Sequence, residues 1–371
     1  MTRARELANL GSNTTDLEAI NAVYDAGGLT GRNLIINGAM QVAQRSTSTA
    51  SITTSAYHTV DRWSTSLTTL GTWTQSQSTD VPSGQGFASS LKMACTTADA
   101  SPAAGDRLLI RQALEGQNVQ QLKKGTANAE SVTLSFWVKS SKTGTYIVEI
   151  YDQDNTRNIA KAYTVSSANT WEKKEVTFSG DTTGAFDNDA SASLYLNMWL
   201  GAGSTYTSGT LATSWQSATS ANRAVGQVNL ADSNTNEWYI TGIQLEVGET
   251  ATPFEHRSYG DELARCQRYL KLGGAGVYGI YNSAANIEIS IPLNPNMRAA
   301  PTLSMAKTTV TISNKTNSNT ATATSVSAVN ISSSPSGVYF AQIGNCNVTS
   351  ASAGHIAQFR TDEFLQLDAE L

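Results

Sequence analysis

The chain has 371 residues, which suits two domains, and its 40% of hydrophobic residues can form a buried core, which excludes global disorder. The net charge of −5 gives no support to nucleic-acid binding, and no apolar run is long enough for insertion into a membrane. The three cysteines are too few and too widely spaced for a disulfide framework or a zinc site, so we expect buried thiols. The first residues lack the apolar segment of a secretory signal, which indicates synthesis in a cytoplasm.

Residues 1–30 have the pattern of a short amphipathic helix. Thr15 is a predicted N-cap with Glu18 three positions on, and the glycines at 27 and 28 end the helix. A helix of about three turns is marginal by itself in water. We therefore expect it to pack on a partner, either its own chain or a neighbouring subunit.

Residues 31–257 contain short alternating or apolar runs separated by Gly, Asn, Asp and Ser. Examples are "SVTLSFWVKS", "GTYIVEIYD" and "ASLYLNMWLGAG". Such runs are typical of strands with one face on a core, and they lack the intervening helices of a parallel sheet. The pattern predicts a mainly β fold, with an antiparallel β-sandwich in this range.

The stretch 240–272 predicts a domain junction. "ITGIQLEV" is the expected last strand, with Ile240, Gly242 and Gln244 on one face and Ile243 and Leu245 on the other. A proline at 253 stops the strand, and the serine at 258 can cap a linking helix over 258–272.

Residues 273–371 predict a smaller C-terminal β-sandwich. Its middle is rich in Ser, Thr and Asn, while "EISIPL" and "GVYFAQI" have apolar faces. Because this domain has few other large apolar residues, we expect a threefold assembly of chains to bury both faces.

Four segments together resemble the virion fibre proteins of tailed bacteriophages (cyanophage- and podophage-like). They are "RNLIINGAMQVAQRSTS", "YHTVDRW", "LSFWVKSSKTGTY" and "ITGIQLEVGETATPFEHRSYGDELARCQRY", the last being the most specific. The resemblance runs from about Asn33 to the C-terminus. It implies a jelly-roll domain similar to carbohydrate-binding modules over 31–257, in a homotrimeric tail fibre that contacts host cell-surface glycans without catalysis. It also implies a place in the virion. We expect residues 1–30, which precede the resembling part of the chain, to attach it to other structural proteins of the virion.

Two alternatives share parts of this pattern. A capsid-surface head fibre or decoration protein would have the same sequence features. A glycan-degrading tailspike is the enzymatic alternative, but no β-helix repeat appears, and the candidate acid pairs lie in polar turns. These pairs are Asp152 with Asp154 and Asp187 with Asp189.

No cofactor or metal is predicted. Gly274, Gly276 and Gly279 have the spacing of a dinucleotide fingerprint but follow a helix and precede a strand, the reverse of the required order. The three histidines are far apart. The acid clusters would suit calcium, but the calcium of jelly-roll carbohydrate modules uses acids in the last strand, where this chain has Thr241 and Gly242.

Aromatic residues in loops are the candidate glycan contacts. Trp215 lies in a long Gly/Ser/Thr loop with Tyr206 close by, and Trp73 in a polar strand is the second choice. For Trp215 a role as a loop anchor or intersubunit plug remains open. We expect the other five tryptophans to be core residues, namely Trp63, Trp137, Trp171, Trp199 and Trp238.

Overall fold

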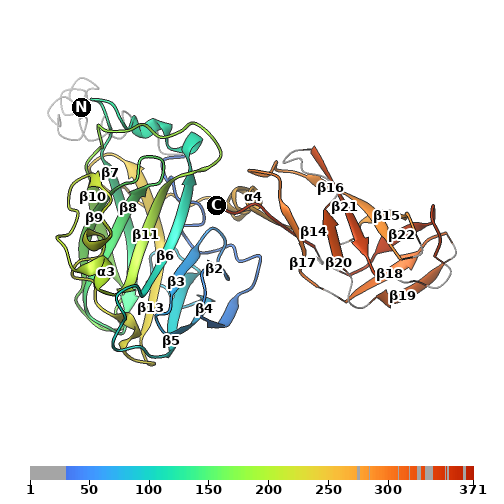
Figure 1. Cartoon of the computed structure of the whole chain (residues 1–371), viewed down its shortest axis with the longest axis horizontal. Coiled ribbons are helices and arrows are strands. Elements are labelled where there is room, and N and C mark those ends of the chain that lie inside the picture. Colours follow the sequence, from blue (N-terminus) through green and yellow to red (C-terminus); the bar gives the residue numbers. More distant parts are fainter. Residues whose placement is uncertain are drawn as a thin grey trace, which may run out of the picture. The chain divides into compact units, whose positions relative to one another are not determined.

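The computed structural model in Figure 1 describes residues 31–371, apart from 274, 275, 284, 308, 317, 324–326, 331–336, 347, 349, 350 and 362–364. The expected helix in residues 1–30 lies outside the described residues. The described chain packs into two compact units. The first contains 31–41, Ser48–Ala56 and Ser64–Arg257, and the second contains Val42–Thr47, Tyr57–Trp63 and Ser258–Leu371.

The first unit is built on two antiparallel sheets, as the sequence predicts for a jelly-roll β-sandwich. The first sheet has the order β1 (Ser48–Ile52), β4 (Thr72–Ser78), β5 (Ser90–Thr97), β13 (Glu237–Val247), β7 (Val132–Ser140), β10 (Glu172–Phe178). The second has the order β12 (Gln216–Ser217), β9 (Arg157–Val165), β8 (Gly144–Asp152), β11 (Ala192–Ala202), β6 (Arg107–Glu115), β3 (Ser64–Thr68), β2 (Ala56–Tyr57). Figure 1 shows β9, β8, β11, β6 and β3 side by side.

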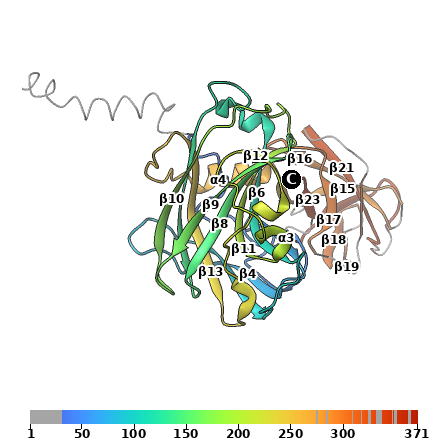
Figure 2. The same ribbon diagram turned by 60° about the vertical axis from the view of Figure 1, so that its left-hand side comes forward.

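Short helices lie in the connections of the first unit. They are the 3-10 turns Gly116–Asn118, Gln120–Leu122, Ser220–Asn222 and Leu230–Asp232, and α3 (Ser204–Thr207). In Figure 2, α3 lies over β11.

Alternate side chains of the two sheets meet in the core of the first unit. Phe136 on β7 and Tyr163 on β9 are both buried, with ring centroids 5.0 Å apart. Tyr146, Val148 and Ile150 of β8 are buried on this inner side. The period of two therefore leaves Glu149 and Tyr151 of the same strand on the opposite, outer face.

A β-bulge corrects the predicted faces of the last strand. Gly242 has a φ of 63°, and the register of β13 against β7 shifts between Thr241 and Gln244. A side chain at 242 would meet the ring of Phe87, since an added Cβ would lie 2.5 Å from it. The bulge restores Ile240 and Ile243 to one side, and both are fully buried, so the strict alternation predicted for this strand was wrong.

The linking helix is shorter than the predicted range 258–272. Helix α4 spans Tyr259–Gln267, and the side chain of Ser258 caps it by accepting a hydrogen bond from the Asp261 N–H. The chain then enters β14 (Leu270–Gly273), which pairs with β23 (Leu365–Asp368) near the C-terminus. Pairing with a distant strand thus overrides the local helical pattern in the last residues of this range.

The second unit has two antiparallel sheets of its own. One has the order β14, β23 (Leu365–Asp368), β17 (Thr302–Met305). The other has the order β19 (Asn319–Ala323), β18 (Val310–Asn314), β22 (Ile356–Phe359), β15 (Tyr278–Tyr281), β16 (Ile287–Leu293), β21 (Gly337–Gly344), β20 (Ser327–Asn330).

The apolar face of "EISIPL" belongs to the core of the second unit itself. Ile287, Ile289, Ile291 and Leu293 of β16 are all buried there, together with Phe359 and other residues. The expectation that a threefold assembly of chains buries this face was therefore wrong, because the second unit buries it by itself.

Two segments, Val42–Thr47 and Tyr57–Trp63, belong to the second unit, although the sequence predicted all of 31–257 to form the first domain. Arg62 is fully buried, forms a salt bridge with Glu370, and has its guanidinium carbon 3.4 Å from the ring centroid of Tyr269. Arg45 forms a second salt bridge, with Asp368 at 2.8 Å. These buried charges are paired inside the second unit, which explains why Val42–Thr47 and Tyr57–Trp63 belong to it.

Candidate functional site

The outer face of the second sheet in the first unit combines aromatic and charged side chains. The loop that carries α3 covers one end of this face, where Trp199 packs with Leu109, Ile147, Ala160 and Ala224. The other end holds Glu149 and Tyr151 of β8, Tyr195 and Asn197 of β11, and Arg111 of β6. Their strands place them together, because Tyr195 is the cross-strand partner of Tyr151, and Asn197 is the partner of both Glu149 and Arg111.

Glu149 is the centre of a buried polar network on this face. Arg223, from the covering loop, binds it with two hydrogen bonds, Nε to Oε1 at 2.8 Å and Nη2 to Oε2 at 2.9 Å. Asn158 and Asn197 each donate to it at 2.9 Å, and the Trp199 indole donates at 3.2 Å. Five donors thus stabilise a fully buried carboxylate, which would otherwise be costly to desolvate.

Tyr151 and Tyr195 stand beside this network and are only half-buried. Their ring centroids are 6.3 Å apart and their planes are within 20° of parallel. The Arg223 guanidinium carbon lies 4.7 Å from the Tyr151 centroid, and that of Arg111 lies 4.3 Å from the Tyr195 centroid. Cation–π contacts therefore hold both guanidinium groups against the tyrosine pair.

Positive charge on this face exceeds negative charge. Glu149 accepts both of its charged hydrogen bonds from Arg223, whereas Arg111 donates Nε to the neutral Asn197 at 2.7 Å and Arg107 donates to the Tyr206 hydroxyl at 2.9 Å. Burial, the largest cause, and the charges of Arg223 and Arg107 lower the pKa of Arg111. The face has the chemistry of a binding surface for a polar molecule with flat apolar patches.

The predicted contact Tyr206 lies at the covered end of this face. It is half-buried in α3, and its ring packs against that of Trp199 at 5.4 Å. With its hydroxyl bonded to Arg107, it positions that arginine rather than standing at a loop tip.

Trp215 does not join this face but closes a small pocket of about 20 Å³. Its indole N–H donates to the Ser179 carbonyl at 2.7 Å, and its ring lies 5.5 Å from Lys124 Nζ. This geometry matches the alternative role of Trp215 as an anchor of its loop, which the sequence analysis left open.

Lys124 beneath it is a buried cation in an oxygen cage. Its Nζ lies 2.5 Å from Asp152 Oδ2 and 3.2 Å from Asp181 Oδ2. It also donates to the carbonyls of Thr183 at 2.8 Å and Gly184 at 2.7 Å. One of the predicted acids, Asp152, is therefore paired with an ammonium group of the chain itself.

Trp73 and Trp137 both differ from their predicted roles. Trp73 is fully buried and donates to the Leu70 carbonyl at 2.7 Å, so it cannot contact a glycan. Trp137 is half-buried on the outer face of the first sheet, between the buried Phe136 and Val138, and is not a core residue. Trp171 is also half-buried, whereas the prediction of a core position is confirmed for the other three, Trp63, Trp199 and Trp238.

Two of the remaining acids accept hydrogen bonds from backbone N–H groups. Asp154 accepts from the Asp187 N–H at 2.9 Å, and Asp189 accepts from the Ser191 N–H at 2.8 Å. Within the described residues, no cluster of three His, Cys, Asp or Glu side chains has the geometry of a metal site. All three cysteines are buried free thiols, as predicted, and burial raises the pKa of Cys95 to about 11 and of Cys346 to about 12.

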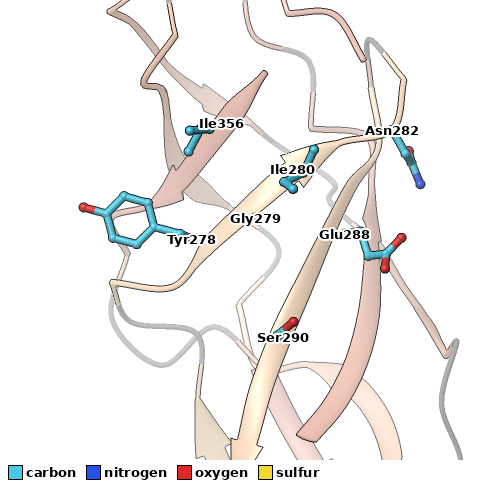
Figure 3. A pocket seen from close by; sticks show the side chains of 7 residues that line it. All are labelled: Tyr278, Gly279, Ile280, Asn282, Glu288, Ser290 and Ile356. Atoms are coloured by element: carbon cyan, nitrogen blue, oxygen red, sulfur yellow. The ribbon is translucent and has the colours of Figure 1, made fainter. Parts of the chain in front are cut away.

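An apolar groove lies on the second unit (Figure 3). Its volume is about 520 Å³, and its lining includes Tyr278 and Ile280 of β15 and Ile356 of β22. These side chains are 58%, 58% and 47% exposed, and Ile280 and Ile356 are cross-strand partners.

In the described part of the chain, no helix is long and apolar enough to span a bilayer.

Sequence reasoning missed the tyrosine and arginine face. The available signal was the glutamate inside the apolar run "YIVEIYD", since a charged residue in a strand pattern requires a partner if it is buried. The partner, Arg223, comes from a loop 74 positions away, which no local pattern indicates.

No family model and no curated protein matches this chain. Solved structures with a similar arrangement include the enzymatically active domain of tailspike protein 4 of bacteriophage CBA120, with 16% identity and a TM-score of 0.30 over 58% of this chain and 21% of that one. A second is the carbohydrate-binding module TmCBM61 in complex with β-1,4-galactotriose, with 9% identity and a TM-score of 0.31 over 59% of this chain and 100% of that one. A third is described as a sugar-binding protein from Bacteroides thetaiotaomicron, with 12% identity and a TM-score of 0.33 over 58% of this chain and 100% of that one.

Proposed function

We propose that this chain is a structural tail-fibre protein of a tailed-phage virion, which attaches to host cell-surface glycans through the outer face of the second sheet. The observation that carries the binding role is the tyrosine pair, Tyr151 and Tyr195, beside a fixed polar network. Sugars present C–H surfaces that stack on aromatic rings and hydroxyls that pair with planar polar groups, and this face supplies both. The virion role rests on the sequence resemblance.

The proposed activity is binding without cleavage. A glycosidase needs one carboxyl group that gives a proton and a second that acts on the sugar. Glu149, the carboxylate held within this face, is fully buried and already accepts five hydrogen bonds. This arrangement favours a fixed structural role for Glu149 and supports the non-enzymatic proposal.

Three copies of the chain are proposed to assemble in the fibre. The exposed groove around Tyr278, Ile280 and Ile356 supports this, because contiguous apolar surface is commonly covered in an assembly. Binding by three weak sites would then gain from avidity.

The direct test is adsorption of the purified full chain to host polysaccharide. Replacing both Tyr151 and Tyr195 with Ala should lower adsorption at least tenfold, whereas Tyr259→Ala, which removes an exposed tyrosine of the second unit, should not. Equal adsorption by the double variant and the parent would refute this binding face. Release of new reducing ends would refute the non-enzymatic proposal, and labelled antibodies on intact virions would test location on tail or head.

A further inference from the structure

Arg111 is held in place but forms no salt bridge with any of the described residues. Its Nε is bonded to Asn197 and its guanidinium group lies on the Tyr195 ring, which fixes both position and orientation. Its two terminal nitrogens have no hydrogen-bond partner among the described residues. Arg111 is half-buried, so these donors can reach a bound molecule while losing part of their hydration.

The surroundings of Arg111 add positive charge. Burial is the largest cause of the lowered pKa of Arg111; the charges of Arg223 and Arg107 act in the same direction, and Tyr195 and Glu149 act in the opposite one. The carboxylate of Glu149 is shared with Arg223 through two hydrogen bonds, and Arg107 is bonded to the neutral Tyr206. The face therefore keeps an excess of guanidinium charge that an anion would balance.

We propose that this face selects acidic saccharides, with an anionic substituent of the sugar bound by the terminal nitrogens of Arg111 and the sugar ring on the Tyr151 and Tyr195 pair. The inference rests on the proposed glycan-binding function and names its ligand class. Guanidinium groups bind planar carboxylates through two parallel hydrogen bonds, and an arginine already fixed by stacking loses little freedom on binding. A uronic-acid carboxylate fits this geometry, and a sulfate ester shares its charge chemistry.

The test compares matched ligands on the full chain. Oligogalacturonate and its methyl ester differ in the charge of the carboxyl group, and a sulfated galactan oligosaccharide tests the second source of negative charge. We expect the acid form to bind at least tenfold tighter than the ester, with a preference that falls as salt rises.

Three variants separate the effect of the positive charge at position 111 from that of the guanidinium geometry. Arg111→Gln should abolish the preference, Arg111→Lys should keep part of it, and Lys173→Gln, which removes an exposed charge from the first sheet, should leave it intact. Thermal unfolding checks that each variant is folded, and Arg111→Lys keeps the test valid if the Gln variant is unstable. A preference for sulfate over carboxylate that needs Arg111 supports the proposal with sulfate as the ligand group.

Two results would overturn the inference in different ways. If acid and ester bind equally, and Tyr195→Ala weakens both, glycan binding stands and the acidic preference is wrong. If no saccharide binds and Tyr195→Ala changes nothing, the proposed function fails together with the inference.

Discussion

Arg223 and Glu149 form a two-point salt bridge at 2.8 and 2.9 Å, with the carboxylate fully buried and the arginine largely so. The pair links the covering loop to the strand beneath it. Removing one partner leaves the other charge buried, which costs about 3–5 kcal/mol, whereas replacing both with apolar groups is often nearly neutral.

We therefore expect Arg223→Met to lower the free energy of unfolding by about 3–5 kcal/mol. The double variant Arg223→Met/Glu149→Leu should lose clearly less than the sum of the two single variants. Urea unfolding of the four proteins measures this. Strict additivity would show that the salt bridge does not couple the loop to the sheet.

Lys124 gives a second stability prediction, with a control next to it in the sequence. Lys124→Met leaves the buried Asp152 without its ammonium partner, so the free energy of unfolding should fall by about 3–5 kcal/mol. Lys123→Met removes a lysine that is 55% exposed and paired with Glu130, and it should cost less than about 1 kcal/mol. Similar losses of unfolding free energy in both variants would show that the contacts of Lys124 with the surrounding oxygens do not stabilise the fold.

The fold was largely predictable from the sequence because strand periodicity is a local property. The run "VTLSFWV" showed strand β7, but not that Trp137 faces outward while Phe136 faces the core. Both residues are large and apolar, so composition cannot decide the side. Register against neighbouring strands decides it, and one bulge, at Gly242, was enough to change the predicted faces of β13.

The candidate site was less predictable because it joins residues from four strands and a loop. Trp215 in a loop and Trp73 in a strand were predicted as glycan contacts, but Trp73 is a core residue and Trp215 anchors its loop. Arg111 and Arg223 contribute more to the candidate site than these tryptophans do. Their significance depends on which of them has a carboxylate partner, and this is fixed only by tertiary structure.

Trp215→Phe should destabilise the first unit without changing glycan adsorption of the folded protein. The phenyl ring keeps a cover over Lys124, but the bond from the indole N–H to the Ser179 carbonyl is lost, at a cost of about 1 kcal/mol. Thermal unfolding and an adsorption assay on the same sample measure the two effects. Reduced adsorption at an unchanged thermal midpoint would restore Trp215 as a glycan contact.

Ile280→Asp should weaken the proposed trimer and leave the second unit folded. Ile280 is 58% exposed beside Ile356, so a charge there has little folding cost but would be desolvated in an interface. We expect sedimentation of the parent as a trimer at micromolar concentration and partial dissociation of the variant. Lys307→Asp, at an exposed position of the same unit, is the control. A parent that sediments as a monomer would exclude the assembly.

The burial of Asp61 predicts that the free energy of unfolding of the second unit depends on pH. Gln44 donates to it from its backbone N–H at 2.8 Å and from Nε2 at 2.5 Å. Burial raises the pKa of Asp61 to about 6, outweighing the opposite effects of these hydrogen bonds and of Arg45. Because this pKa is above the ordinary value of 3.8, the folded state holds the proton more tightly than the unfolded state.

The stabilisation from this proton is complete below about pH 4 and is lost as pH rises through about 6. Asp61→Asn has no such titration. Its unfolding free energy relative to the parent should therefore rise by about 2–3 kcal/mol between about pH 4 and pH 7. Urea unfolding of both proteins across this range measures the difference, in which the titrations common to both chains cancel. A difference independent of pH would mean that Asp61 titrates alike in the folded and unfolded chains.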